Sequence, residues 1–135
     1  MGQTPPLVLV VDDDDSIISL VSISLQRDGY QIVAAHNGRE ALALWKSLGS
    51  GIDLVITDIE MPVMSGIEFA NQLYRLHADI PILFISGSAE ADTLGEKTSV
   101  NGPLHFLSKP FDLRTLREMV AGLMHPATHG ARAVS

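Results

Sequence analysis

The sequence predicts an α/β domain with a doubly wound, five-stranded parallel sheet and helices on both faces. Two observations in the 135 residues predict this fold. Short runs of Val, Ile and Leu are continuous rather than alternating, which is typical of strands covered on both faces. Helical patterns lie between these runs, and such an alternation indicates parallel β-α units. Right-handed crossovers then leave only a few doubly wound topologies.

Five short segments carry the strand pattern. They are Leu7–Val11, Gln31–Ala35, Leu54–Thr57, Ile82–Ile85 and His105–Leu107. In an open parallel sheet, ligands bind at the carboxyl ends of the strands. The residues that end these segments are therefore the candidate functional residues.

Polar and helix-breaking residues mark the ends of the predicted helices. The helices are expected over Ser16–Arg27, Arg39–Leu48, Gly66–Leu76 and Leu113–Met124. Ser65 and Asp112 stand directly before the last two helices and are good N-cap residues. Gly29, Gly49 and Pro126 follow the first, second and last helices, where glycine and proline commonly end a helix.

The segment between the fourth and fifth strands departs from this regular pattern. Residues 89–101 carry only Leu94 and Val100 as large apolar anchors, and Gly102-Pro103 follows them. We therefore expect a short or mobile helix in this segment.

The two ends of the chain differ in composition from the middle. Residues 1–6 are polar and contain prolines, and residues 125–135 lack apolar periodicity. We expect a single domain over residues 7–124, with a loose tail at each end.

Composition excludes several classes of function. The 16 acidic and 9 basic residues give a net charge of −7, so the chain is a poor candidate for gripping the phosphates of nucleic acid. The absence of cysteine excludes disulfides, thiolate metal sites and a cysteine nucleophile. No apolar run is long enough to span a membrane, and the N-terminus lacks the pattern of a secretion signal. We therefore expect a cytoplasmic protein that binds neither membrane nor nucleic acid.

Charged and polar residues end four of the predicted strands. In strand order they are Asp12, Asp13, Asp58, Ser86 and Lys109. Because the carboxyl ends of parallel strands meet at one edge, the fold brings three carboxylates, a hydroxyl group and an ammonium group together. At about 4 Å and an effective dielectric constant of about 20, each pair of carboxylates costs on the order of 4 kcal/mol, and a hard divalent cation such as Mg²⁺ removes that cost.

This combination of groups suits phosphoryl transfer. A carboxylate can act as a nucleophile and form an aspartyl phosphate. The transfer depends on positioning and on neutralisation of charge, which Mg²⁺, a lysine and a small hydroxyl group supply.

Four motifs stand in order at the strand ends. They are Val-Leu-Val-Val-Asp-Asp at 8–13, Asp-Leu-Val-Ile-Thr-Asp-Ile-Glu-Met-Pro-Val-Met-Ser-Gly at 53–66, Pro-Ile-Leu-Phe-Ile-Ser-Gly at 81–87, and Phe-Leu-Ser-Lys-Pro-Phe at 106–111. With these motifs the chain resembles the receiver domain of two-component response regulators, the CheY-like superfamily, over residues 7–124. The resemblance implies a flavodoxin-like sheet with strand order 2-1-3-4-5.

The resemblance also implies a role for each acidic residue. Asp58 is the expected phosphoacceptor. Asp13 and Asp58 are expected to bind Mg²⁺ directly, with the backbone carbonyl of Glu60 as a third ligand. Asp12 is expected to act on the ion through water.

Lys109, Ser86 and Phe106 complete the implied site. Lys109 is expected to pair with the phosphoryl group, and Ser86 to form a hydrogen bond with it after transfer. Ser86 stands where the family more often has Thr, and it keeps the hydroxyl group. Ser86 and Phe106 also match the switch positions of the family. Phe106 lacks the hydroxyl group of a Tyr, and in the alternative interpretation it is simply a core residue.

The family accepts a phosphoryl group from a phosphohistidine on a histidine kinase or histidine phosphotransfer protein, within a phosphorelay. It then shifts conformation and alters the binding of a downstream protein. Such a module is not an enzyme for an external metabolite, because it catalyses only its own phosphorylation and dephosphorylation. The chain is either a stand-alone regulator or a receiver of a longer protein. The stretches at 85–87 and 105–111 resemble receivers attached to hybrid sensor kinases.

Several side chains have a second interpretation. Asp14 and Asp15 either strengthen the field for Mg²⁺ or cap the helix that starts near Ser16. The surplus apolar surface of that helix either packs on the last helix or forms a docking shoulder for a helical phosphodonor, to which we assign Ile18 and Leu25. The five histidines lack metal-ligand spacing and are expected to face solvent.

A different class of function is a small phosphatase of the haloacid dehalogenase type. Asp12-x-Asp14 after the first strand fits the nucleophile motif of that class formally, but no later acidic motif follows the fourth strand. Replacement of Asp58 discriminates between the two, because the phosphatase would depend on Asp12. In a third interpretation, the receiver fold serves only as a constitutive binding module.

Overall fold

A single five-stranded parallel sheet forms the centre of the molecule. The computed structural model describes residues 5–76, 79–87 and 105–125. The strands are β1 (Leu7–Val11), β2 (Gln31–Ala35), β3 (Leu54–Asp58), β4 (Ile82–Ser86) and β5 (His105–Ser108), in the order β2-β1-β3-β4-β5. All neighbouring pairs are parallel, which confirms the predicted doubly wound sheet and its strand order.

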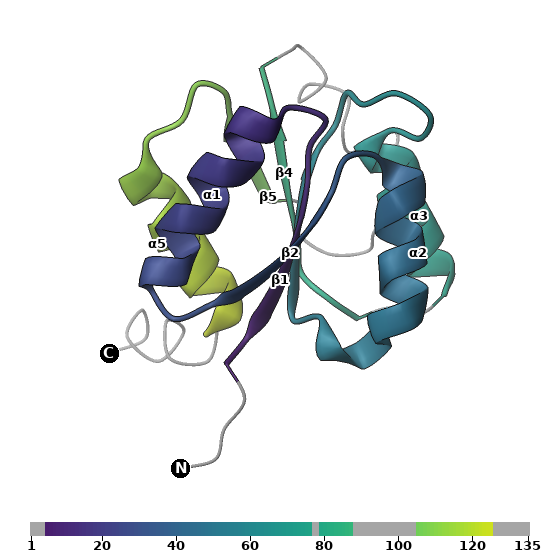
Figure 1. Cartoon of the computed structure of the whole chain (residues 1–135), viewed down its shortest axis with the longest axis horizontal. Helices are drawn as coiled ribbons and strands as arrows, with labels where there is room; N and C mark the ends of the chain where they lie inside the picture. The colour runs from purple at the N-terminus through teal and green to yellow at the C-terminus, as the bar shows by residue number, and fades with distance from the viewer. Residues whose placement is uncertain (1–4, 77–78, 88–104, 126–135) are drawn as a thin grey trace.

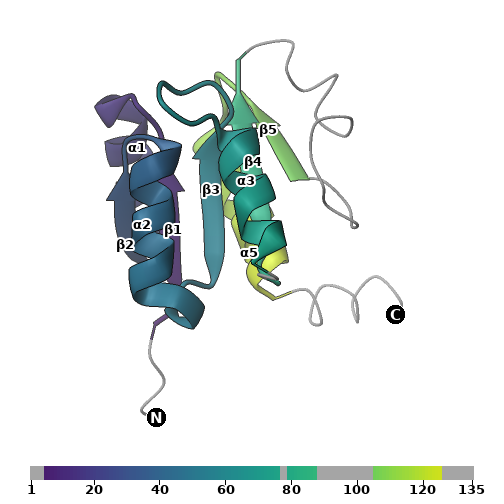
Figure 2. The same ribbon diagram turned by 90° about the vertical axis from the view of Figure 1, so that its right-hand side faces the viewer.

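Helices cover both faces of the sheet (Figure 1; Figure 2). They are α1 (Asp15–Arg27), α2 (Gly38–Leu48), α3 (Gly66–Arg75) and α5 (Leu113–Met124), with a 3₁₀ turn at Gly49–Gly51 after α2. Helices α1 and α5 lie on one face, and α2 and α3 lie on the other (Figure 1). The central strands therefore have apolar partners on both sides, as the continuous apolar runs predict.

The core forms one layer on each side of the sheet, because successive side chains along a strand point to opposite faces. In β1, Val8 and Val10 pack in the layer beneath α1 and α5, whereas Leu9 and Val11 pack in the layer beneath α2 and α3. All four side chains are fully buried. Burial of such a side chain stabilises the fold by about 1.5–3 kcal/mol, so the two layers hold the strand ends in a fixed register.

The strands extend further toward their carboxyl ends than the sequence predicts. Strands β3, β4 and β5 each run one residue further, to Asp58, Ser86 and Ser108. The ladder continues there, because Asp58 pairs with Ile85 and Ser86 pairs with Ser108. Asp58 and Ser86 are therefore strand residues, with less conformational freedom than loop residues.

Two helices begin one residue earlier than predicted, and a side-chain cap explains each start. Helix α1 begins at Asp15 because Asp14 Oδ1 accepts a hydrogen bond from the amide of Ser16 (2.8 Å). Helix α2 begins at Gly38 because Asn37 Oδ1 accepts one from the amide of the third helical residue (2.8 Å). Side-chain oxygens at this position satisfy amides that have no partner within the helix.

Of the two interpretations of the surplus apolar surface of α1, packing beside the last helix is confirmed, and the assignment of Ile18 and Leu25 to a docking shoulder is wrong. Leu25 is fully buried, and Ile18 packs against the layer beneath α1 and α5, so neither forms a docking shoulder. The large apolar side chains that α1 exposes are Leu20 (43%) and Ile23 (57%). Helix α1 packs against both the sheet and α5, so a wide part of its surface is buried. Helical periodicity alone does not predict which residues lie outside this buried part.

Some predictions fall outside the residues that the structure describes. They include the short or mobile helix over residues 89–101 and most of the tails at 1–6 and 125–135, so the domain limits stay predictions. In the described part of the chain, no helix is long and apolar enough to cross a membrane.

Gly66, the first residue of α3, should not tolerate a side chain. A Cβ atom there would lie 2.0 Å from the backbone oxygen of Asp58 and 3.0 Å from Thr57 Oγ1. Gly66→Ala should therefore lower the free energy of unfolding in urea by about 1–3 kcal/mol. Gly122→Ala is the control, because a Cβ there meets nothing within 4 Å. It should be neutral or stabilise α5 by up to about 1 kcal/mol, and equal losses in both variants would contradict the close approach.

Candidate functional site

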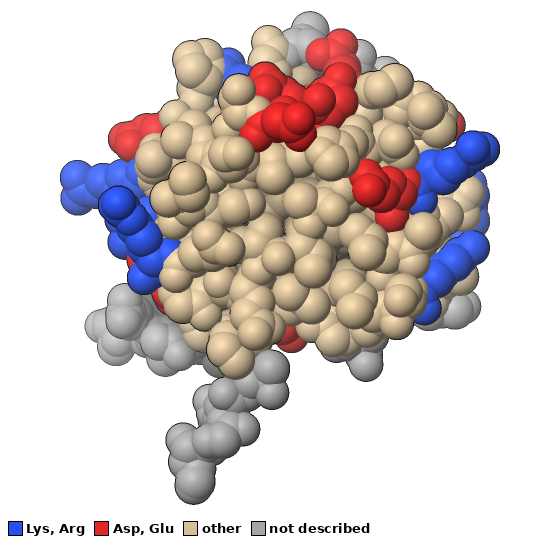
Figure 3. Space-filling model, in the orientation of Figure 1, with Lys and Arg blue, Asp and Glu red and all other residues tan. Residues whose placement is uncertain are grey.

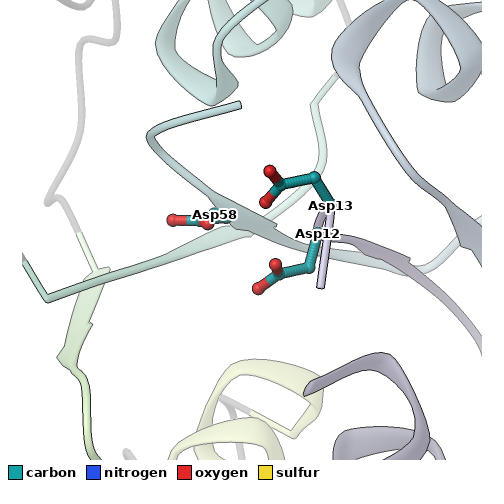
Figure 4. Close-up of side chains that lie close together, drawn as sticks. All are labelled: Asp12, Asp13 and Asp58. Carbon is teal, nitrogen blue, oxygen red and sulfur yellow. The ribbon is translucent and has the colours of Figure 1, made fainter. Parts of the chain in front are cut away.

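Three carboxylates meet where β1 and β3 end. Asp12 and Asp13 directly follow β1, and Asp58 is the last residue of β3. Because β1 and β3 are neighbours, one carboxylate oxygen of each residue lies within 4.8 Å of the others. Figure 4 shows the three side chains extending to the same side of the sheet edge. The fold thus brings together the three acids that the sequence analysis selected.

Asp12 is the most deeply buried member of this cluster. Its side chain is inaccessible to solvent. Its Oδ1 accepts a hydrogen bond from the amide of Asp14 (2.9 Å), and its Oδ2 accepts one from Lys109 Nζ (3.0 Å). The Asp12 amide donates to the carbonyl of Ala35 at the end of β2 (3.1 Å). Burial raises the pKa of Asp12, and the hydrogen bonds from Asp14 and Lys109 oppose that rise without cancelling it.

Asp58 is also largely buried, and a backbone hydrogen bond fixes the loop that follows it. Asp58 Oδ2 accepts a hydrogen bond from Lys109 Nζ (3.2 Å), and its Oδ1 lies 3.4 Å from the amide nitrogen of Glu60. The carbonyl of Ile59 accepts a hydrogen bond from the amide of Gly66 (2.9 Å). Asp58 therefore has a fixed backbone and one oxygen that is only weakly engaged.

Lys109 supplies the positive charge of the site. Its amide donates to the carbonyl of Ser86 (3.0 Å), and the peptide bond between Lys109 and Pro110 is cis. Burial alone would lower the pKa of Lys109. The hydrogen bonds and the attraction to Asp12 and Asp58 outweigh burial, so this pKa is raised. The ammonium group is therefore charged at neutral pH and pairs with both carboxylates.

The cluster keeps an excess of negative charge, because it has three carboxylates and Lys109 pairs with only two of them, Asp12 and Asp58. Asp13 is exposed and, with Glu60, lines a pocket of about 610 Å³ beside the cluster. The site therefore combines oxygen ligands with access from solvent. Hard divalent cations bind proteins through such oxygen ligands and retain water in the remaining positions.

Ser86 borders the acidic cluster, whereas Phe106 packs against an apolar layer of the core. Ser86 is buried at the end of β4, and its carbonyl accepts the hydrogen bond from Lys109, so it borders the site. Phe106 pairs in register with Phe84 and packs against the apolar layer beneath α2 and α3. Phe106 is thus half-buried at the edge of this layer, and its role as a switch residue stays a prediction.

Asp14 and Asp15 lie beside the cluster but outside it. Asp14 caps α1, which confirms that one of these two acids has the capping role. Asp15 lies in the first turn of α1, where its Oδ1 is 2.9 Å from His36 Nε2. Acidic side chains gather above the end of β1 in Figure 3. The exposed acids Asp13, Asp14 and Asp15 follow β1 directly, so much of the negative charge of the chain is concentrated at this edge.

His36 is the residue near the site whose contacts the sequence analysis missed. Its side chain is 53% exposed, as expected for a histidine facing solvent, yet each ring nitrogen contacts a carboxylate. One partner, Glu40, is four residues away, a spacing that occurs in many helices. The other, Asp15, is 21 residues away in α1, whereas His36 lies between β2 and α2, so no local pattern could reveal the contact.

The fold and the site define a doubly wound α/β protein with a lysine-paired acidic cluster at the carboxyl edge of its sheet. The family model described as the response regulator receiver domain matches residues 8–121. The chain therefore belongs to the response regulator receiver domain family of two-component systems. This match decides between a receiver and a phosphatase of the haloacid dehalogenase type in favour of the receiver.

Individual relatives agree with this assignment. The chain is 35% identical over 117 residues to the sensor kinase CckA of Brucella abortus (strain 2308), across 87% of this chain and 12% of that protein. It is similar to the chemotaxis protein CheY4 of Vibrio cholerae, with 35% identity, a TM-score of 0.77, and coverage of 89% of this chain and 99% of that chain. A chain of the CheX-CheY-BeF3-Mg²⁺ complex from Borrelia burgdorferi has 26% identity and a TM-score of 0.75, over 86% of this chain and 87% of that chain. The chain spans less than half the length of the curated relatives it matches.

Removal of Lys109 should leave two buried carboxylates without their shared cation. Lys109→Met should lower the free energy of unfolding by about 1–3 kcal/mol at neutral pH, measured by urea denaturation. A second change, Asp12→Asn, should recover part of this loss because it removes the uncompensated charge. Lys46→Met, at an exposed position of α2, should change stability by less than about 0.5 kcal/mol. Equal losses in the two lysine variants would rule out the ion pairs as the cause.

Proposed function

We propose that this chain is the phosphoacceptor module of a two-component phosphorelay, with Asp58 as the residue that accepts the phosphoryl group. The observation that carries the proposal is the placement of the Asp58 carboxylate. It lies within 4.8 Å of the carboxylates of Asp12 and Asp13, and 3.2 Å from Lys109 Nζ. A carboxylate held between acids and a lysine in this way can receive a phosphoryl group and share its charge.

The phosphodonor would be a phosphohistidine on a histidine kinase or a histidine phosphotransfer protein. An oxygen of Asp58 attacks the phosphorus atom, and the bond between phosphorus and the imidazole nitrogen of the donor breaks. The electron pair of that bond stays on the imidazole nitrogen, and the phosphoryl group ends as an acyl phosphate on Asp58. The weakly engaged Oδ1 of Asp58 is the oxygen best able to attack.

Asp13, Asp58 and the backbone carbonyl of Glu60 would hold Mg²⁺, and Asp12 would contact it through water. The oxygen donors of the cluster and the open pocket beside Asp13 support this choice of cation. When bound, Mg²⁺ neutralises negative charge that the carboxylates share with the phosphoryl oxygens. The related complex from Borrelia burgdorferi contains Mg²⁺ together with BeF3, which supports the same cation here.

Lys109 and Ser86 would bind the phosphoryl oxygens on the other side. Lys109 Nζ already lies beside the Asp58 carboxylate and is charged. Ser86 ends the strand next to β3, and its hydroxyl group can donate a hydrogen bond to a phosphoryl oxygen. A shift of Ser86 toward that oxygen would act on the neighbouring strand that carries Phe106, and so would alter the surface that binds a downstream protein.

The module would catalyse only its own phosphorylation and dephosphorylation. Its expected partners are proteins, namely the phosphodonor and a downstream protein. The net charge of −7 disfavours binding of nucleic acid by this domain itself.

The geometry favours Asp58 over Asp12 as the nucleophile. Both oxygens of Asp12 accept hydrogen bonds at 3.0 Å or less, and its side chain has no access to solvent. Asp58 keeps one oxygen at 3.4 Å from its donor. A nucleophile needs a free lone pair and a path to its substrate, so Asp58 is the better acceptor.

An apolar groove beside the site would receive the phosphodonor. It has a volume of about 310 Å³ and is lined by Ile17, Leu20, Lys109, Pro110 and Phe111. Leu20 is exposed where it lines the groove, and Ile23, three residues further along α1, is exposed as well. An amphipathic helix could bury these side chains while its phosphohistidine reaches Asp58. Leu20 and Ile23 thus replace Ile18 and Leu25 as the proposed docking shoulder.

Intact mass after treatment with phosphoramidate and Mg²⁺ tests the phosphoacceptor. The wild type should gain the mass of one phosphoryl group, and Asp58→Asn should gain none, because a carboxamide is not a nucleophile for this reaction. Asp53→Asn is the matched control, since Asp53 lies before the opposite end of β3 and accepts a hydrogen bond from the amide of Leu7. This variant should be phosphorylated like the wild type, and chelation of Mg²⁺ should suppress the reaction in both. Full incorporation in Asp58→Asn would refute the assignment.

Leu20→Ser should separate docking from chemistry. Transfer from the histidine kinase that phosphorylates the wild type should slow by roughly tenfold, because an apolar contact of about 1–2 kcal/mol is lost. The rate with phosphoramidate should not change, since the carboxylates are held by Asp14, Glu60 and Lys109 and a leucine side chain supplies no polar group to the reaction. Leu48→Ser, an equally exposed leucine on α2, should leave both rates unchanged. Parallel losses with both donors would count against the docking shoulder.

A further inference from the structure

His36 connects the two helices that begin beside the acidic cluster. Its Nε2 lies 2.9 Å from Asp15 Oδ1 in the first turn of α1, and its Nδ1 lies 3.1 Å from Glu40 Oε1 in the first turn of α2. The amide of His36 donates a further hydrogen bond to Glu40 Oε1 (2.6 Å). Among the described residues, these two carboxylates are the charged groups that face the ring, one from each packed helix.

This geometry favours a doubly protonated ring. Carboxylate oxygens accept hydrogen bonds and do not donate them, and a neutral imidazole carries only one N–H group. A neutral His36 would therefore direct the lone pair of one nitrogen at a carboxylate, whereas an imidazolium donates to both. The hydrogen bonds with Glu40 and then Asp15 also raise the pKa of His36, which agrees with the geometry.

The segment around His36 contacts the two loops that adjoin the acidic cluster. The carbonyl of Ala35 accepts a hydrogen bond from the amide of Asp12, in the loop between β1 and α1 (3.1 Å). The amide of Gly38 donates to the carbonyl of Met64, in the loop between β3 and α3 (3.2 Å). A Cβ on Gly38 would lie 2.7 Å from that oxygen, so α2 meets this loop without an intervening side chain. A shift between the starts of α1 and α2 would therefore change the spacing of the two loops.

We propose that His36, as an imidazolium, is a positioning residue for the cation site. It holds the first turn of α1 against the first turn of α2. This contact fixes the spacing between the loop that carries Asp13 and the loop that carries Glu60. This inference rests on the proposed function, which assigns both loops to Mg²⁺ binding. Loss of one ring proton removes one of the two links and loosens the spacing. Deprotonation of His36 therefore weakens Mg²⁺ binding, although it removes a nearby positive charge.

The test measures the Mg²⁺ dissociation constant of His36→Gln and of the wild type by NMR titration, and divides the value for the variant by the value for the wild type. The titrations are done at about pH 6 and at about pH 9, which lie on either side of the usual pKa range of histidine. A ratio at one pH cancels the effects that pH has on the carboxylates of both proteins. At about pH 6 the variant should bind Mg²⁺ about two- to fivefold more weakly, the effect of an exposed ion pair. At about pH 9 the ratio should approach one, because the wild-type ring is then neutral too.

The sign of the effect distinguishes positioning from simple repulsion. If His36 acted only as a positive charge near the site, its removal would strengthen Mg²⁺ binding at the lower pH. A ratio of one or less at about pH 6, or the same weakening at both pH values, would overturn the proposal. His125→Gln removes an exposed histidine at the end of α5 and should give a ratio of one at both pH values.

A second readout follows the link itself. The amides of Ile17 and Ile18 donate to the carbonyl of Asp14 (3.1 and 3.2 Å) in the first turn of α1. Corrected for the intrinsic effect of pH, their exchange protection should fall between about pH 6 and about pH 9 in the wild type but not in His36→Gln. Unchanged protection in the wild type would overturn the proposal.

The two proposals fail in different ways. A ratio of one with normal phosphorylation of Asp58 would defeat only the role of His36. Absence of phosphorylation with the expected ratio would defeat only the phosphoacceptor. A wild type that bound no Mg²⁺ would overturn both.

Discussion

Repulsion among three carboxylates at one edge of the sheet is the constraint on which the site depends. Asp12, Asp13 and Asp58 place oxygens within 4.8 Å of one another. At an effective dielectric constant of about 20, each close pair costs on the order of 4 kcal/mol. Lys109 offsets part of this repulsion through its contacts with Asp12 and Asp58. In the proposed function, the remaining negative charge attracts a cation and, through the cation, a phosphoryl group.

The scaffold tolerates this repulsion because backbone contacts fix the strands and loops that carry the acids. Strand β1 is buried on both faces, which anchors the chain directly before Asp12. Gly66 lies so close to the backbone of Asp58 that a residue with a side chain does not fit at position 66. The contacts of His36 and Gly38 likewise connect the starts of α1 and α2 to neighbouring parts of the chain. The carboxylates can therefore stay close together without the strand ends separating.

Local sequence signals predicted the sheet and the acids, but packing between distant elements decided the details. Apolar runs and the residues that end them are local features, and parallel strands necessarily bring Asp12 and Asp58 to one edge. The outer face of α1 depends on its packing with α5, so the burial of Leu25 and the exposure of Leu20 could not be derived from helical periodicity. The contact of His36 with Asp15 was hidden because it joins residues far apart in the sequence that meet only in the folded chain.

We propose that Asp58, rather than a neighbouring acid, carries the phosphoryl group. Borohydride reduces an acyl phosphate to an alcohol and so converts a phosphorylated aspartate into homoserine, which peptide mass spectrometry locates. After phosphorylation of the wild type with Mg²⁺, we expect homoserine at position 58 and aspartate at positions 12 and 13. Homoserine at position 12 or 13, with position 58 unchanged, would contradict the site proposed for this receiver domain.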